Sequence, residues 1–178
     1  TLTALFFLSL SYSQSNRIYG SFESNAVYYQ ENEEEDYENK LGSNNYLNIK
    51  YLFNSNWNVE IQVESYLPRR LQSYSDSFED THLSTLSINY SKKNFKMSVG
   101  SIYDQFGSGI LLRSYYDPNL GVDNSIYGAR IKYKPSTGID ITGLIGKQRN
   151  YWELGEGQIK GFDTQIYIND YLFKKSKT

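Results

Sequence analysis

Strict alternation of apolar and polar residues runs through most of this chain. A period of two places every second side chain on the same face of an extended segment, so the pattern predicts β-strands. The apolar side of these segments carries no Asp, Glu, Lys or Arg. About eight such segments are expected, at residues 17–29, 47–53, 57–64, 85–90, 95–100, 127–133, 139–146 and 162–168.

The connections between these segments alternate in length. Short links at 54–56, 91–94 and 135–138 are separated by long polar stretches, expected near 30–45, 67–81, 103–125 and 150–160. Short turns at one end and long loops at the other are typical of transmembrane β-barrels in the bacterial outer membrane. A Lys or Arg facing lipid at mid-bilayer costs about 2–4 kcal/mol in a barrel, which would explain the charge-free face. We therefore predict an all-β, antiparallel up-and-down meander that forms a transmembrane β-barrel.

A soluble antiparallel sandwich is the alternative, because it also buries one alternating apolar face against a second sheet. It does not explain why the long loops gather at one end. The segment lengths also suit a tilted bilayer crossing, which takes about 9–11 residues.

The two ends of the chain add an expectation about export and completeness. The apolar run Leu2–Leu10, followed by small residues, indicates a partial secretory signal cut after Ser13, with a short buried strand or helix as the alternative. A transmembrane helix needs about 20 apolar residues, and no stretch approaches that length. The chain passes Phe173 and ends in a basic tail, so residues 14–178 are expected to be an incomplete barrel, with a closed eight-stranded barrel that ends at Phe173 as the alternative.

Composition narrows the possible partners. The formal net charge is −2 and no basic stripe with interleaved aromatics occurs, so nucleic acid is not an expected partner. The absence of Cys rules out disulfides and thiolate metal sites. The 18 Tyr residues suit a membrane protein, since amphipathic rings are enriched where hydrocarbon meets water. No cofactor is expected.

Four motifs beside the long stretches carry a resemblance. They are Glu64-Ser65-Tyr66-Leu67-Pro68, residues 103–113 (YDQFGSGILLR), residues 119–125 (NLGVDNS) and residues 148–153 (QRNYWE). With these motifs the chain resembles an uncharacterised family of Bacteroidota outer-membrane proteins, over approximately Ile18 to Ile168. The resemblance implies a barrel of more than eight strands, of which this chain is the N-terminal portion. It supplies no catalytic or ligand-binding residue.

Two features could suggest chemistry, and both are better explained as solvated loop residues. His82 is the single histidine and follows an acidic segment, which is too little for the proton-transfer constellation of a barrel hydrolase. The run Glu31–Glu38 is rich in carboxylates that suit hard cations, but it lacks the spacing of a defined calcium loop. We expect no catalytic residue and no metal site.

The stretch Tyr103–Asn124 is too long and too apolar for a plain exposed loop. We expect a strand within it, at Leu112–Tyr116. The rest is predicted to fold against or into the barrel mouth, with Arg113, Asp117 and Asp123 lining a constriction. An ordinary extracellular hairpin is the equally weighted alternative.

The polar faces of the segments carry charges of both signs. Mixed charges favour ion pairs across a wet or filled lumen rather than an ion-selective ring. The expected protein is a non-enzymatic outer-membrane barrel that contacts lipid and acts as a passive channel or as a scaffold for envelope proteins. A surface-binding protein with long loops is the second possibility, and a barrel hydrolase is the third. The charged residues concerned are Lys50, Lys96, Arg130 and Lys132 against Glu60, Glu64, Asp140 and Asp163.

Overall fold

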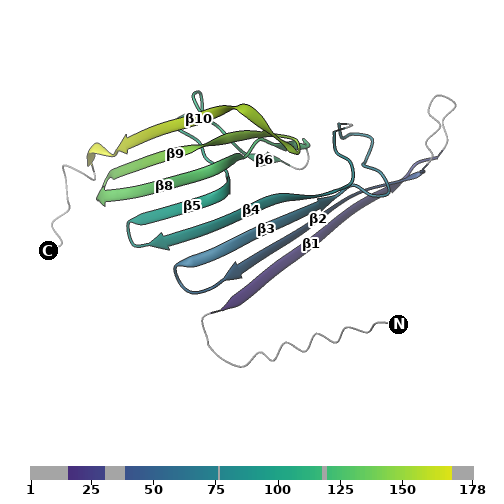
Figure 1. Ribbon diagram of the computed structural model, residues 1–178, viewed down its shortest axis with the longest axis horizontal. Coiled ribbons are helices and arrows are strands. Elements are labelled where there is room, and N and C mark those ends of the chain that lie inside the picture. The colour runs from purple at the N-terminus through teal and green to yellow at the C-terminus, as the bar shows by residue number, and fades with distance from the viewer. Residues whose placement is uncertain (1–15, 31–38, 76, 118–119, 170–178) are drawn as a thin grey trace.

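The computed structural model describes residues 16–30, 39–75, 77–117 and 120–169. Eight strands lie side by side in one antiparallel sheet, with β1 at one edge and β10 at the other (Figure 1). Two further short strands, β6 and β7, pair only with each other. The strands are β1 (Arg17–Tyr28), β2 (Leu41–Leu52), β3 (Trp57–Ser65), β4 (Thr81–Lys92), β5 (Phe95–Ile102), β6 (Tyr116–Asp117), β7 (Val122–Asp123), β8 (Ile126–Ser136), β9 (Ile139–Asn150) and β10 (Glu153–Ile166).

The order of the sheet follows the order of the chain, so each strand pairs with the next one along the sequence, apart from the inserted β6 and β7. This confirms the all-β antiparallel meander. Among the described residues β1 and β10 each pair on one side only, so the eight strands form an open sheet. The polypeptide contains no helix, in the part that the structure describes, that is both long and apolar enough to cross a membrane.

The three short links are confirmed as tight turns between β2 and β3, β4 and β5, and β8 and β9. The long loop expected at 150–160 is wrong. β9 continues to Asn150 and β10 starts at Glu153, with Tyr151 in the left-handed region at the turn. A register shift between Leu154 and Gln158 lets this polar, glycine-containing stretch stay in the sheet as a bulge.

The strand expected at Leu112–Tyr116 is also wrong. Only Tyr116 and Asp117 form β6, and Arg113 makes a single isolated bridge with Gln105. The cause is the Ser114 side chain, whose hydroxyl takes the place of a backbone group in the hydrogen bonds that a strand would form here. The Ser114 hydroxyl accepts from the Asp104 backbone N–H at 2.9 Å and donates to the Ile102 carbonyl at 3.2 Å, which holds this segment against the end of β5.

The segment 103–125 folds against one face of the sheet. Its residue Tyr116 accepts a hydrogen bond from Gln62 of β3, whereas Phe106 lies against Gly161 of β10. These two strands are separated by four others in the sheet. One segment can reach both only if the sheet curves around it, so we call this side the inner face and the opposite side the outer face.

Glycines pack closely where the sheet curves. Gly128 of β8 lies in register with Gly100 of β5 and with Gly146 of β9. A Cβ added at Gly128 would lie 2.0 Å from the Ile145 carbonyl oxygen, and one at Gly100, whose φ is +105°, would lie 2.0 Å from the Leu86 carbonyl oxygen. Side chains cannot occupy this row, which is typical of sheets that bend sharply.

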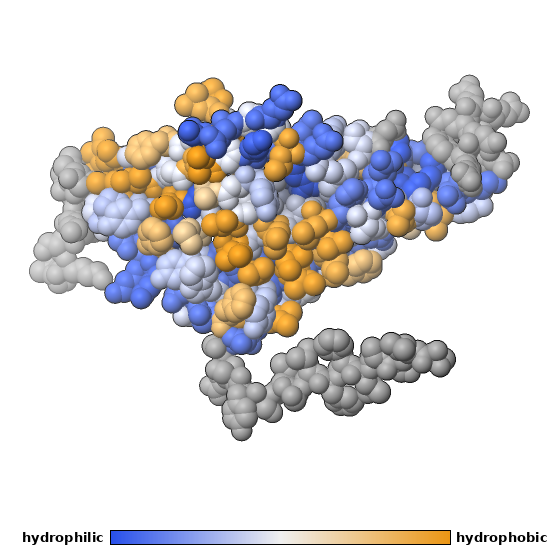
Figure 2. Space-filling view, in the orientation of Figure 1, coloured by the Kyte–Doolittle hydropathy of each residue, from blue (hydrophilic) through white to orange (hydrophobic). Residues whose placement is uncertain are grey.

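The two faces have the reverse of the usual polarity. Large apolar side chains on the outer face are exposed, including Phe22 at 67%. Figure 2 shows apolar side chains gathered over the middle of the sheet and polar ones toward the long-loop end. The inner face instead buries polar side chains. Those buried there or beneath the segment 103–125 include Gln62, Glu64, Thr85, Ser87, Ser98, Ser114, Asp123 and Thr142.

A small apolar cluster joins the segment 103–125 to the sheet. Ile102, Phe106, Ile126 and Leu144 are buried together. Leu112 and Ile159 pack against them. Burial of apolar side chains stabilises by about 1.5–3 kcal/mol each, so this cluster fixes the segment in place.

Candidate functional site

The inner face of the curved sheet is the candidate site, and its centre is an ion pair. Arg149 of β9 donates from Nη1 to Asp123 Oδ2 at 2.7 Å, and the two side chains are 8% and 4% exposed. Arg149 also donates to the backbone carbonyls of Ser84 and Tyr151. A buried charge pair needs further hydrogen bonds to offset its desolvation, and these contacts supply part of them.

Tyr103 completes the surroundings of Asp123. Its hydroxyl lies 3.1 Å from both carboxylate oxygens of Asp123 and donates to them. Burial, with the charge of Asp123 as the next contribution, raises the pKa of Tyr103 well above its ordinary value. The phenol therefore stays protonated at neutral pH and remains a donor.

A second buried carboxylate lies at the end of β3. Glu64 is 1% exposed, and it accepts from the Tyr66 hydroxyl at 2.6 Å and from Gln62 Nε2 at 3.2 Å. Gln62 also donates to the Tyr116 hydroxyl at 2.8 Å, which ties β6 to β3. Burial, together with the neighbouring Glu64, raises the pKa of Tyr66, so this hydroxyl too stays a donor.

Asp104 connects the segment 103–125 to β8. Its carboxylate forms ion pairs with Arg130 Nη1 at 3.0 Å and with Lys132 Nζ at 2.9 Å. Arg130 also donates to the Ser98 hydroxyl at 2.9 Å. One carboxylate thus neutralises part of a basic stretch on the inner face.

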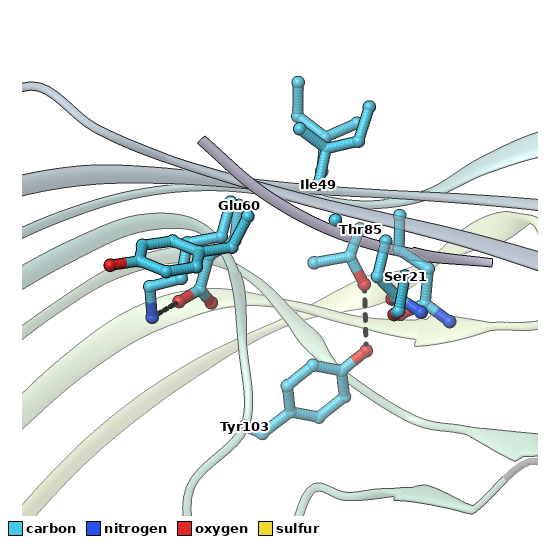
Figure 3. A pocket seen from close by; sticks show the side chains of 11 residues that line it. Ser21, Ile49, Glu60, Thr85 and Tyr103 are labelled. Carbon is cyan, nitrogen blue, oxygen red and sulfur yellow. Dashed lines mark hydrogen bonds and ion pairs between the residues drawn. The ribbon is translucent and has the colours of Figure 1, made fainter. Parts of the chain in front are cut away.

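A hollow of about 410 Å³ lies beside these networks, on the inner face of β1 to β4. On one side of the hollow, Figure 3 shows the Tyr103 hydroxyl directed at the Thr85 hydroxyl, 3.3 Å away. On the other side Lys50 Nζ and Glu60 Oε1 form an ion pair at 2.5 Å. The lining combines apolar and polar residues with this one pair of opposite charges.

Aromatic rings pack together at the long-loop end of the sheet. Tyr66 lies at the centre of this group, with ring centroids 5.3 Å from Phe78 and 6.0 Å from Trp152. Trp152 stacks on His82 at 4.1 Å, and its indole N–H donates to the Ser77 carbonyl at 2.8 Å. These contacts hold the described part of the loop between β3 and β4 against the tip of the β9–β10 hairpin.

Of the three residues predicted to line a constriction, Asp117 and Asp123 lie on the paired short strands β6 and β7. Asp123 lies in the buried ion pair, whereas Arg113 places its guanidinium 5.0 Å from the centre of the Tyr115 ring. Asp117 accepts a hydrogen bond from the Leu120 backbone at 3.3 Å. Asp123 joins the inner-face network through its side-chain ion pair.

Sequence reasoning missed Arg149, Asp104 and Tyr103 as members of the site. Arg149 lies in one of the motifs that carried the family resemblance, which was the available signal. Its partner is 26 residues away in the chain, so the pairing depends on the fold. Several of the charged residues expected to form ion pairs do so. Lys50 pairs with Glu60, Arg130 and Lys132 pair with Asp104, and Asp140 pairs with Lys134.

The features considered for chemistry fall in different places. His82 stacks on Trp152, and its Nε2 atom is buried without a hydrogen-bond partner in the described part of the chain. The acidic run Glu31–Glu38 and the expected signal segment 1–13 lie outside the described residues. Within the described residues, no group of three or more His, Asp or Glu side chains is arranged to hold a metal ion.

Comparison with protein-family models matches residues 1–178 to a family of unknown function, DUF6029. The chain belongs to this family. The expectation of an uncharacterised family is thereby confirmed, and the match extends over the whole chain. No curated protein matches it.

Proposed function

We propose that the chain forms the wall of a transmembrane β-barrel in the bacterial outer membrane, in a member of the Bacteroidota, and acts as a passive channel or as a scaffold for envelope proteins. The role is non-enzymatic. The observation that carries this proposal is the inverted polarity of the sheet, with polar side chains buried on the inner face and large apolar side chains exposed on the outer face.

The outer face supports contact with lipid. Soluble monomers rarely expose apolar patches larger than a few hundred Å², because such surface is unfavourable in water. Contact with lipid acyl chains removes the free-energy cost of exposing these apolar side chains to water. The exposed apolar residues on this face include Ile18, Phe22, Leu47, Leu86, Ile88, Val99, Ile131, Ile145, Phe162 and Ile166.

The single-sided pairing of β1 and β10 supports a barrel of more than eight strands. Each edge strand presents unpaired backbone N–H and C=O groups, which cannot remain unsatisfied in hydrocarbon. Further strands that join these edges would close the barrel.

A passive channel fits the inner face better than a selective one. Selective pores line their constriction with charges of one sign, whereas Lys50 pairs with Glu60, and Arg149 pairs with Asp123. The segment 103–125 narrows the interior. Deletion of residues 107–122 is expected to raise single-channel conductance in planar bilayers, and unchanged conductance would argue against a pore that this segment restricts.

A scaffold role is favoured by the tip of the same segment. Ile110 and Leu111 are 88% and 91% exposed. Neighbouring apolar side chains at this exposure are a candidate docking point for an envelope protein. Co-purification of a stable partner with the native protein, lost on the double change Ile110→Ser and Leu111→Ser, would support this role over a channel.

A matched pair of variants tests the membrane assignment. Phe22 and Ser21 are adjacent on β1 and belong to the outer and inner faces respectively. Phe22→Arg should reduce the free energy of folding into lipid vesicles by about 2–4 kcal/mol, while Ser21→Arg should change it by less than about 1 kcal/mol. Equal effects, or a wild-type protein that is folded and monomeric in buffer without detergent, would refute the proposal.

A further inference from the structure

Three residues that line one hollow of the sheet each hold a buried polar atom without a hydrogen-bond partner. These atoms are His82 Nε2, Ser125 Oγ and Arg149 Nη2, and the described residues supply none of them with a partner. Their residues line a hollow of about 240 Å³. Leaving a buried polar group unsatisfied costs about 1–3 kcal/mol, so three in one place require an explanation.

The hollow arises because β5 is shorter than its neighbour β4. Pairing between them begins at Ser87 and Gly100, so the part of β4 from Thr81 to Leu86 has no partner on that side. After Ile102 the chain turns toward the inner face. Arg149 reaches across the gap to the Ser84 carbonyl, and the space that remains is the hollow.

The walls of the hollow are apolar. Leu83, Leu86, Tyr127 and Leu154 line it, and all four side chains are also exposed. The hollow therefore joins a polar end, at Ser125 and Arg149, to an apolar surface. This combination suits an amphiphile with a small polar head.

The polar end of the hollow requires a ligand atom that accepts hydrogen bonds, such as an oxygen. An arginine side chain donates hydrogen bonds and cannot accept them, so Nη2 requires an acceptor atom. The Ser125 hydroxyl, on a residue only 1% exposed, is able to donate to the same atom or to its neighbour. Since Asp123 already pairs with Arg149, the head need not carry a full negative charge.

We propose that this hollow binds the head of a fatty acyl chain. The carboxylate or ester oxygen accepts from Arg149 Nη2 and Ser125 Oγ, and the first carbons of the chain lie against Leu83, Leu86 and Leu154. The proposal rests on the assignment of the outer face to lipid. It adds a defined acyl-binding site to a wall that otherwise meets lipid without specificity.

The two tryptophans provide a direct measurement. Trp152 lines the hollow, and Trp57 begins β3 at the opposite end of the sheet. In a Trp57→Phe background, Trp152 is the only remaining tryptophan. Dibromostearate added to the folded protein in detergent should quench Trp152 fluorescence and reach saturation.

Variants of the polar and apolar ends make the test specific. Ser125→Ala removes a hydroxyl that has no hydrogen-bond partner among the described residues, so folding should be retained while the half-saturating concentration rises about threefold to tenfold. Leu86→Gln should raise it by about fourfold or more through lost apolar contact. The controls are Ser136→Ala, far along β8, and Ile88→Gln, two residues from Leu86 on the same face, and neither should change it.

Quenching that never saturates, or that is equal in Ser125→Ala and Ser136→Ala, would overturn the acyl site. A dibrominated phospholipid tested in parallel identifies the source of the chain. Saturation by the phospholipid alone indicates a membrane lipid, and saturation by the free acid alone indicates a fatty acid. Vesicle flotation of the same preparation separates the two proposals, because protein that floats without saturable quenching lacks the site but keeps its membrane assignment.

Discussion

The buried ion pair between Arg149 and Asp123 should contribute much more to stability than the exposed pair between Lys50 and Glu60. The side chains of the first pair are 8% and 4% exposed, and those of the second are 45% and 40% exposed. Their N–O distances are similar, at 2.7 and 2.5 Å. The comparison therefore separates the effect of burial from the effect of distance.

The expected coupling energy of each pair depends on the effective dielectric constant around it. Unit charges at the 2.7 Å of Arg149 and Asp123 attract by about 6 kcal/mol at an effective dielectric constant of 20 and by about 1.5 kcal/mol in water. Each change also leaves the other charge buried, which destabilises by about 3–5 kcal/mol. We expect a coupling energy of about 2–4 kcal/mol for the buried pair and at most about 1 kcal/mol for the exposed pair.

A double-mutant cycle measures this difference. The near-isosteric changes Arg149→Gln and Asp123→Asn are compared with their combination, and Lys50→Gln and Glu60→Gln form the control cycle. Each variant is folded into short-chain lipid vesicles and unfolded with urea, with tryptophan fluorescence as the signal. A coupling energy for Arg149 and Asp123 no larger than that of the control would refute the view that the surroundings of this pair are a low-dielectric, tightly packed part of the inner face.

Three other variants report on features of the inner face. Gly128→Ala should prevent folding or destabilise by more than about 3 kcal/mol, because the added Cβ would lie 2.0 Å from the Ile145 carbonyl oxygen; Gly143→Ala, where nothing lies within 4 Å, is its control. A small, similar effect of both in urea titrations would contradict the close approach. Tyr66→Phe should cost about 1–3 kcal/mol, since it removes a donor to buried Glu64, while Tyr133→Phe on the outer face should cost less than about 0.5 kcal/mol. Phe106→Ala should destabilise by about 3–5 kcal/mol and speed proteolysis within 107–117, and protease resistance equal to wild type would show that this ring does not anchor the segment.

The strands and turns of the sheet could be predicted from the sequence, because they depend on residues that are close together in the chain. Alternation at Trp57, Val59 and Ile61 places each residue on a face without reference to distant parts of the chain. The polar turn residues at 54–56 and 137–138 likewise act within a few residues.

The inner-face networks could not be predicted in the same way. Whether Glu153–Gln158 forms a loop or a bulged strand depends on its pairing with β9, and the partner of Arg149 is set by the route of the segment 103–125. Ser114 shows the same limit on a smaller scale. Its hydroxyl bonds to backbone groups ten and twelve residues away, and the expected strand does not form there.

The place of Phe106 has a consequence for biogenesis. Its ring packs under Gly161 of β10, although it precedes β8, β9 and β10 in the chain. During synthesis the segment is made before the strands that will cover it, and it acquires its full set of neighbours only when the last of them joins. Completion of the sheet and burial of Phe106 are therefore a single coupled event, and protection of this ring from solvent would report when β10 pairs with β9.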